Sequence, residues 1–207
     1  MFFRKFVVGQ LGANCYLLAC EKTKKAVVID PGSEEDTGMI LEILREKGFK
    51  LEYIINTHGH YDHIGGNQKL KSHTSAKILI HGLDAEMLAD KGKNLSFLSG
   101  SNLLSPNADQ FLVEGEEISV GFLRFKVIHT PGHTPGGICL ILEDIVFTGD
   151  TLFAQGIGRT DLPGGSYNEI IHSIKNKLFQ LDDDKIIYPG HGRDSTIGKE
   201  KKYFDLY

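Results

Sequence analysis

The sequence predicts a layered α/β architecture in which two sheets pack between outer helices. Short runs rich in Val, Ile and Phe, bounded by Gly and Pro, recur in both halves of the chain and indicate strands. One longer stretch in each half repeats its apolar residues at helical spacing. The 207 residues, of which 41% are hydrophobic, suffice for one sizeable core. We therefore expect a single domain over residues 1–207.

The first half begins with strands. We expect them at residues 2–8, 15–19, 25–29, 53–55 and 78–80. A helix is predicted to begin at Ser33, with Asp36 as its capping-box partner, and to end at Gly48. A short helical stretch follows near residues 83–90.

Residues 91–110 are rich in Gly, Ser and Asn, and Phe97, Leu98, Leu103 and Leu104 are interspersed among them. The segment is interpreted either as a surface loop that tucks these side chains onto the core or as a lid over a substrate.

The second half repeats the pattern of short strands. We expect them at residues 111–113, 117–120, 123–128, 138–142, 145–148 and 186–188. A helix interrupts them: Ser166 and Glu169 form a capping box, and apolar residues recur at helical spacing as far as Leu181.

The composition argues against nucleic acid and membranes as partners. The net charge is −4, and the lysines are scattered rather than gathered into a basic stripe. No stretch approaches the roughly 20 apolar residues that a membrane span requires, and no signal-peptide pattern follows the N-terminal run. Cys15, Cys20 and Cys139 are odd in number and show no CxxC spacing. We therefore expect a cytoplasmic, reducing location and no cysteine chemistry.

The segment from Thr57 to His63 is the densest chemical signal in the chain. Directly after an apolar strand it carries His58, His60, Asp62 and His63. Neutral imidazoles and carboxylates are ligands that suit zinc, iron or manganese. We expect His58 and His60 on one side of an extended segment, with Asp62 and His63 at the turn into a helix that Gly65 and Gly66 permit.

Three further strand ends share the order strand, glycine, ligand. They lead to His133, Asp150 and His191. Rigid strands bring the chain to one edge of the sheets, and a residue without Cβ allows a tight turn that directs the next side chain inward. Because two metal ions need more ligands than one histidine-rich segment supplies, the sequence predicts a seven-residue centre for two metals.

The remaining histidines lack this pattern and are expected to be noncatalytic. They are His73, His81, His129 and His172. The sequence allows two interpretations each for His129 and for Asp30. His129 could contact a ligand imidazole instead, and Asp30 is either the partner of such an imidazole or a turn former before Pro31.

The segments THGHYDHIGG, TPGHTPGG, FTGDTLF and YPGHG together resemble the metallo-β-lactamase superfamily, and within it the glyoxalase II (hydroxyacylglutathione hydrolase) branch. The resemblance runs from about residue 10 to residue 195. It implies an αββα sandwich of two mixed sheets flanked by helices. It further implies that His58, His60 and His133 hold one metal, that Asp62, His63 and His191 hold the second, and that Asp150 bridges them.

The cofactors that the resemblance implies are two zinc ions, with iron or manganese as alternatives. Zinc lowers the pKa of bound water from 15.7 to about 7, which supplies a hydroxide for attack on a thioester carbonyl. Asp62 would be both a ligand and the residue that orients the hydroxide. Arg159 would meet the acidic thiol part of the substrate, or would instead pair with Asp161.

The sequence predicts the class of reaction more narrowly than it predicts the substrate. The chain ends sixteen residues after His191, so we expect no separate C-terminal helical domain of the kind with which full-length glyoxalase II holds glutathione. S-lactoylglutathione is therefore one hypothesis among small-molecule acyl thioesters. The sequence does not predict an oligomeric state.

Rival functions come from the same superfamily. Persulfide dioxygenases resemble these motifs but hold a single iron, here with His58, His133 and Asp150. Lactonase and β-lactamase chemistry would use the same two-metal cluster. Nucleases are disfavoured because they usually carry large extra modules, and a non-enzymatic metal protein would need a closed coordination shell.

Overall fold

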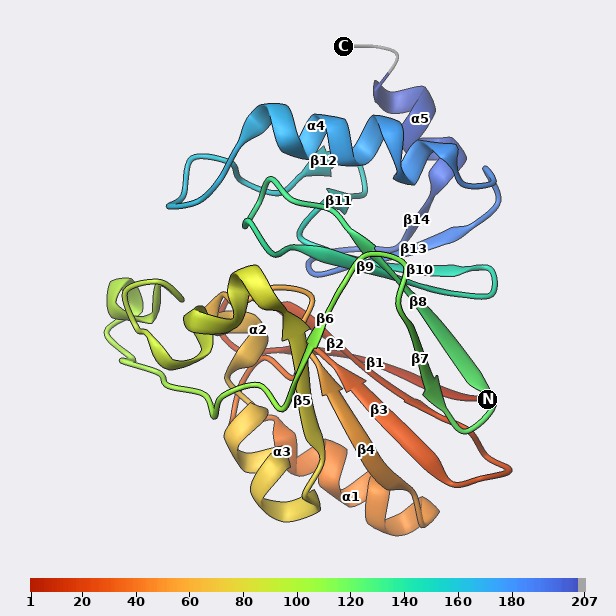
Figure 1. Cartoon of the computed structure of the whole chain (residues 1–207). Coiled ribbons are helices and arrows are strands. Elements are labelled where there is room, and N and C mark those ends of the chain that lie inside the picture. Colours follow the sequence, from red (N-terminus) through yellow and green to blue (C-terminus); the bar gives the residue numbers. More distant parts are fainter. Residues whose placement is uncertain (205–207) are drawn as a thin grey trace.

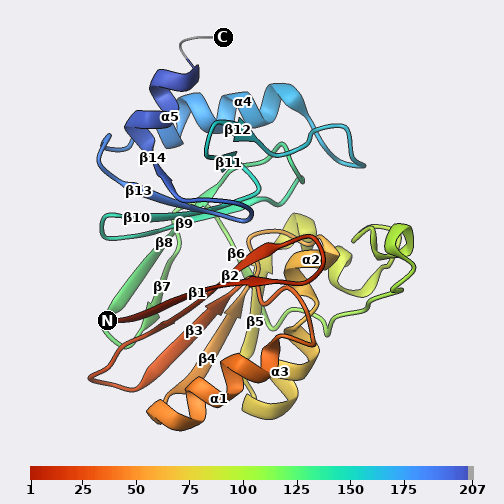
Figure 2. The ribbon, with the colours of Figure 1, turned by 180° about the vertical axis from the view of Figure 1, so that it is seen from behind.

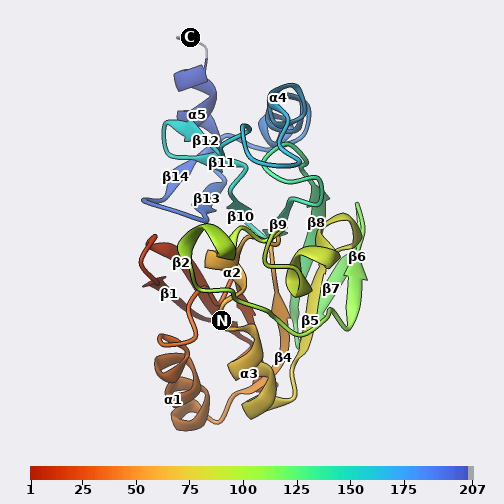
Figure 3. The ribbon, with the colours of Figure 1, turned by 90° about the vertical axis from the view of Figure 1, so that its left-hand side faces the viewer.

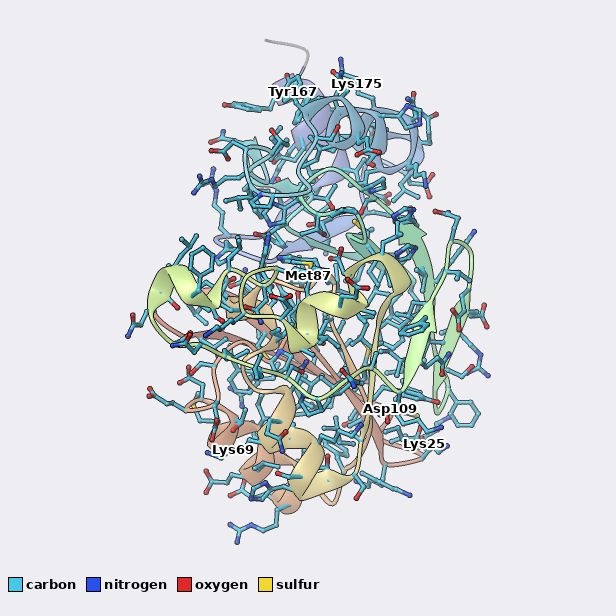
Figure 4. The ribbon with its side chains drawn as sticks, turned by 60° about the vertical axis from the view of Figure 1, so that its left-hand side comes forward. Lys25, Lys69, Met87, Asp109, Tyr167 and Lys175 are labelled. Atoms are coloured by element: carbon cyan, nitrogen blue, oxygen red, sulfur yellow. The ribbon has the colours of Figure 1, made fainter. Side chains whose placement is uncertain are left out.

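Two six-stranded sheets pack against each other between two layers of helices (Figure 1). The computed structural model describes residues 1–204. Helices α1 (Thr37–Lys47) and α3 (Asn67–Thr74) cover the first sheet, and α4 (Tyr167–Asn176) and α5 (Ile197–Phe204) cover the second (Figure 3). Lys69 and Lys175 mark these two helix layers at opposite ends of the molecule (Figure 4). The expected αββα sandwich is confirmed.

Both sheets are mixed. The first contains, in spatial order, β1 (Phe2–Val8), β2 (Ala13–Ala19), β3 (Lys25–Ile29), β4 (Lys50–Ile55), β5 (Lys77–His81) and β6 (Gln110–Leu112). The strands from β1 to β3 are antiparallel, and those from β3 to β6 are parallel. Parallel pairing follows from the helical connections, which return the chain to the same edge of the sheet.

The second sheet has the order β14, β13, β10, β9, β8, β7. Its strands are β7 (Glu117–Val120), β8 (Leu123–His129), β9 (Ile138–Leu142), β10 (Ile145–Gly149), β13 (Ile186–Pro189) and β14 (Ser195–Thr196). A small antiparallel pair, β11 (Leu152–Phe153) and β12 (Gly156–Ile157), follows β10.

Strand β2 contributes side chains to two of the three hydrophobic clusters. Its residues alternate between faces, so that Cys15 and Leu17 enter the cluster under the first helix layer while Tyr16 and Leu18 enter the cluster between the sheets. A third cluster joins the second sheet to α4 and α5. The sheets are therefore buried on both faces, and functional groups have to project from the strand ends.

The predicted start of the first helix is wrong. The helix begins at Thr37 rather than Ser33. The Asp36 carboxylate accepts a hydrogen bond from Gly9 N at 2.8 Å and makes no capping bond, while Ser33 Oγ accepts from Glu35 N at 3.2 Å. A contact with the β1–β2 turn thus replaces the local cap that the sequence suggested.

The other helix predictions hold with changes of extent. The stretch near residues 83–90 is the 3₁₀ helix η1 (Gly82–Ala89). Ser166 Oγ accepts from Glu169 N at 3.3 Å, as the capping box predicts, but α4 ends at Asn176 and a separate 3₁₀ turn, η3 (Leu178–Gln180), follows. The three cysteines are free and buried.

One side of the sandwich collects the loops that carry the predicted ligands. Helix α2 (Tyr61–Ile64) and the β5–β6 connection lie there, at the left of Figure 1 and the right of Figure 2. Strands β4, β8, β10 and β13 each run into a ligand-bearing loop on this side. None of the helices within residues 1–204 has the length and apolar character needed to cross a membrane.

Candidate metal centre

The histidine-rich segment leaves β4 through a bend at Thr57 and His58 rather than fully extended, and it turns into α2 at Tyr61, as expected. His60 keeps an extended backbone at the N-cap, and Tyr61 begins the helix. Gly59 is needed between the two histidines because a Cβ there would collide with the side chain of Met87. Met87 belongs to η1 and lies where the two halves of the sandwich meet (Figure 4).

The first ligand set consists of His58, His60 and His133. One ring nitrogen of each lies within 4.8 Å of the others. His60 Nδ1 and His133 Nε2 face each other at 2.9 Å. All three side chains are buried. This set combines the segment after β4 in the first sheet with the loop after β8 in the second.

The second ligand set consists of Asp62, His63 and His191. His191 Nε2 lies 3.2 Å from His63 Nε2 and 3.2 Å from Asp62 Oδ2, and His63 Nε2 lies 3.5 Å from Asp62 Oδ2. His63 is fully buried, whereas the His191 side chain is 26% exposed. The second set is therefore the more open of the two.

Asp150 lies between the sets. Its Oδ2 is 3.5 Å from His133 Nε2 in the first set, and its Oδ1 is 3.5 Å from His63 Nε2 in the second. A Cβ on Gly190 would collide with this carboxylate. The strand-glycine-ligand pattern thus has a further cause besides the turn, since the glycine before His191 makes room for the bridging residue.

Burial and neighbouring charge separate the pKa values of the two sets. Burial, reinforced by the surrounding imidazoles, puts the pKa of His58 well below its usual value and lowers that of His60 to about 3. Burial also acts against protonation of His63, but Asp62 and Asp150 outweigh it and raise its pKa to about 10. His58 and His60 therefore present neutral nitrogens.

Asp62 and His191 stabilise each other's charged forms. Burial would raise the pKa of Asp62, but His63 and His191 hold it well below its usual range. Burial would lower the pKa of His191, but its hydrogen bond to Asp62 and the charge of Asp150 raise it. The carboxylates in and beside the second set thus favour the positively charged forms of its two imidazoles.

The donor atoms fit metal ions. Four buried side-chain polar atoms lack a hydrogen-bond partner among residues 1–204, and three belong to this centre: His58 Nε2, His60 Nε2 and Asp150 Oδ1. Buried polar groups without partners are rare and require a specific reason. Seven imidazole and carboxylate side chains around two points supply that reason, because this donor chemistry suits zinc, iron and manganese.

Asp30 is a partner of the second set, which confirms one of its two interpretations. Its Oδ2 lies 3.1 Å from His63 Nδ1, and its two oxygens also accept from Thr57 N at 2.7 Å and Thr57 Oγ1 at 2.6 Å. Asp30 is buried and has φ +50°, the left-handed region. It fixes the orientation of the His63 ring from behind.

Asp84, which the sequence did not suggest, ties together the loops of the first set. This buried carboxylate on η1 accepts from Gly59 N at 3.1 Å, Thr134 Oγ1 at 2.7 Å and Gly136 N at 2.6 Å. It therefore joins the His58–His60 segment to the loop that carries His133. The sequence does not distinguish it from Glu86, the other acidic residue of the same helical stretch.

The remaining histidines lie outside the centre. These are His73, His81, His129 and His172. His129 Nε2 lies 2.9 Å from the carbonyl oxygen of Pro135, and its ring stacks on that of His81 at 4.1 Å. The interpretation of His129 as a partner of a ligand imidazole is wrong, because the imidazole it contacts is that of His81.

A cavity of about 490 Å³ opens above the ligands. Leu98 lines it, and Phe97, Leu98 and Leu104 are 51%, 66% and 59% exposed. Of Phe97, Leu98, Leu103 and Leu104, Leu103 packs against the core cluster, so among these four the surface-loop interpretation holds for that residue. The segment forms one wall of the cavity.

Arg159 also lies on the cavity wall, where its side chain and its backbone carbonyl make separate contacts. Its guanidinium makes two hydrogen bonds of 2.9 Å to the Asp161 carboxylate, and both side chains are exposed. Its carbonyl oxygen lies 2.8 Å from His133 Nδ1 and orients that ligand. The pairing with Asp161 is confirmed, and the contact with a substrate stays a prediction.

Comparisons with known proteins agree with this geometry. A family model described as the metallo-beta-lactamase superfamily matches residues 8–191. Hydroxyacylglutathione hydrolase GloC of Haemophilus influenzae is 39% identical over 197 residues, which cover 91% of this chain and 90% of that protein. The mitochondrial persulfide dioxygenase ETHE1 of Homo sapiens is 35% identical over 192 residues, covering 90% and 68%. The crystal structure of the BLEG-1 B3 metallo-beta-lactamase matches with a TM-score of 0.90, 34% identity and 97% coverage of each chain.

Proposed function

Because this chain belongs to the metallo-beta-lactamase superfamily, we propose that it is a zinc-dependent hydrolase that cleaves an acyl thioester. The position of Asp150 carries the proposal, since its two oxygens lie 3.5 Å from a ligand nitrogen of each set. A carboxylate so placed is suited to bridge two metal ions. The similarity to GloC of Haemophilus influenzae supports a thioester, and S-lactoylglutathione is the first substrate to test.

Each residue of the centre has a role in this proposal. His58, His60 and His133 would hold one ion, Asp62, His63 and His191 the other, and Asp150 both. Two zinc ions bound there would supply a hydroxide at neutral pH and would stabilise the oxyanion of the transition state.

The protein's own groups position and protect this chemistry. Asp62 stays ionised because His63 and His191 hold its pKa low, so it accepts a hydrogen bond from the attacking water and orients it. Asp30 and the Arg159 carbonyl fix the rings of His63 and His133. The leaving thiolate is a weak base, so the reaction does not require a strong general acid.

The test is hydrolysis of S-lactoylglutathione and simple acyl thioesters by the zinc-loaded protein, with a lactone as comparison. We expect thioester hydrolysis that chelation abolishes and that Asp62→Ala reduces at least about a hundredfold. Hydrolysis that survives both treatments, or absence of thioester hydrolysis with zinc, iron or manganese bound, would refute the proposal.

A persulfide dioxygenase is the second candidate, favoured by the 35% identity to ETHE1 of Homo sapiens. In that case one iron would be held by His58, His133 and Asp150. Oxygen uptake with glutathione persulfide distinguishes the two functions. Stoichiometric oxygen consumption by the iron-loaded protein would replace the hydrolase proposal.

The proposed setting is the cytoplasm, with a small thioester as the partner. The three cysteines are free and buried, which suits a reducing compartment.

A further inference from the structure

The cavity above the metal centre is walled by apolar side chains from four separate segments. They are Leu11 from the β1–β2 turn, Leu98 from η2 (Ser96–Ser99), Phe153 and Ile157 from β11 and β12, and Leu162 from the loop before α4. These residues are far apart in the sequence and meet only around the ligands. Its volume of about 490 Å³ lies within the range of small-molecule sites.

Two of these side chains remain exposed although they are large and apolar. Leu11 is 56% exposed and Leu98 is 66% exposed. Neither belongs to any of the three core clusters, so they do not stabilise the fold by burial. Exposed apolar groups that face a concave site are typical of surfaces that become buried by a ligand.

The charged residues around the cavity also favour a substrate group without negative charge. Arg159 is the one Lys or Arg among the lining residues that the structure describes, and it pairs with the Asp161 carboxylate. An adjoining cavity shares Leu11 with this one and is lined by Glu34, Glu35 and Asp36, with no described cation. Away from the metal ligands, a thiol that carries carboxylates, such as glutathione, would find no Lys or Arg without a carboxylate partner among the described lining residues.

We propose that this cavity binds an uncharged aliphatic group of the substrate, and that the preferred thioester is therefore an apolar one rather than a glutathione derivative. This inference rests on the proposed hydrolase function, and it names the substrate class of the same site. The aliphatic group belongs either to the acyl side or to the thiol side of the thioester, and the substrates distinguish the two.

The first experiment varies one side of the thioester at a time. Acetyl, butyryl and hexanoyl groups on the neutral thiol N-acetylcysteamine test the acyl side, and acetyl esters of N-acetylcysteamine and hexanethiol test the thiol side. We expect kcat/KM to rise at least about tenfold along one series, because each CH₂ group removed from water contributes up to about fourfold. S-lactoylglutathione should be slower than the best apolar ester. Equal kcat/KM along both series would overturn the inference.

Two single substitutions test whether the cavity wall causes the difference in kcat/KM between short and long substrates. Leu98→Ser should lower kcat/KM for the longest substrate several-fold and lower that for the shortest one by a smaller factor. Leu104→Ser is the matched control, because Leu104 lies in the same segment, is 59% exposed and does not line the cavity. Equal effects of the two substitutions would contradict the proposal.

A binding measurement separates this inference from the proposed function. Calorimetry of the zinc-loaded protein with acetate, butyrate and hexanoate reports on the cavity without any reaction. We expect hexanoate to bind at least about tenfold more tightly than acetate, and Leu98→Ser to remove most of this difference. Equal affinities would overturn the apolar cavity even if thioesters are hydrolysed. Tighter hexanoate binding without hydrolysis of any thioester would support the cavity and refute the reaction.

Discussion

The two ligand sets of the metal centre differ in charge although they lie side by side. His58 and His60 in the first set are kept neutral by burial and by neighbouring imidazoles. The second set contains Asp62, and the carboxylates around His63 and His191 outweigh burial and raise their pKa values. A cation in the first set therefore depends on Asp150 for charge compensation, whereas a cation in the second also meets Asp62.

The two sets also differ in how they are held. Asp30 acts directly on an imidazole of the second set, through the contact of 3.1 Å with His63 Nδ1. Asp84 acts on the first set through the backbone, by accepting from Gly59 N and Gly136 N. Asp30 thus fixes the orientation of the His63 ring, and Asp84 fixes the spacing between the two loops that carry the first set.

The largest effect is expected for Asp150→Ala. This substitution removes the carboxylate whose two oxygens lie 3.5 Å from a ligand nitrogen of each set, so both ions should bind more weakly and the rate should fall at least about a hundredfold. Elemental analysis together with a thioester assay measures both consequences. Full activity in this variant would contradict the two-metal account.

Next come His60→Ala and His191→Ala, which disable one set each. Each variant should lose about one metal equivalent per chain and at least about a hundredfold in rate. His172→Ala serves as the control, because His172 is an exposed histidine on α4 outside the centre. Two retained metal equivalents in either ligand variant would show that the sets are not independent sites.

The buried carboxylates behind the sets should give intermediate effects that differ in kind. Asp30→Asn should weaken metal binding about tenfold to a hundredfold, because it alters the partner of a ligand ring. Asp84→Ala should in addition lower the free energy of unfolding by about 1–3 kcal/mol for each backbone N–H left unpaired. Metal titration against a competing chelator and denaturant unfolding separate the two. Identical behaviour of both variants would remove the distinction drawn between them.

The smallest effect is expected for Ser166→Ala, which removes the N-cap of α4. The free energy of unfolding should fall by about 1 kcal/mol while both metal equivalents remain bound. Denaturant unfolding and elemental analysis check this. Loss of metal would mean that α4, which packs against the turn at Gly132, controls the first set more directly than the contacts indicate.

The ligands were predictable because their signal is local. His133, Asp150 and His191 each follow a strand and a glycine, and the structure brings them together with the segment from His58 to His63. Both sheets and most of their strands were predictable for a similar reason, since short runs of β-branched and aromatic residues bounded by Gly and Pro are a local signal.

What the sequence missed depends on contacts between distant segments. Asp84 became visible only when the structure placed η1 against the loops of the first set. The start of α1 moved because Gly9 N, far away in the sequence, donates to Asp36. The sequence left Leu98 either packed onto the core or in a lid over a substrate, and only the structure places it, exposed, on the wall of the cavity.

The number of metal ions bound per active chain tests the central claim most directly. The account predicts two equivalents when thioester hydrolysis is maximal, with activity rising in step with the filling of both sets. Full activity with a single bound ion would contradict it.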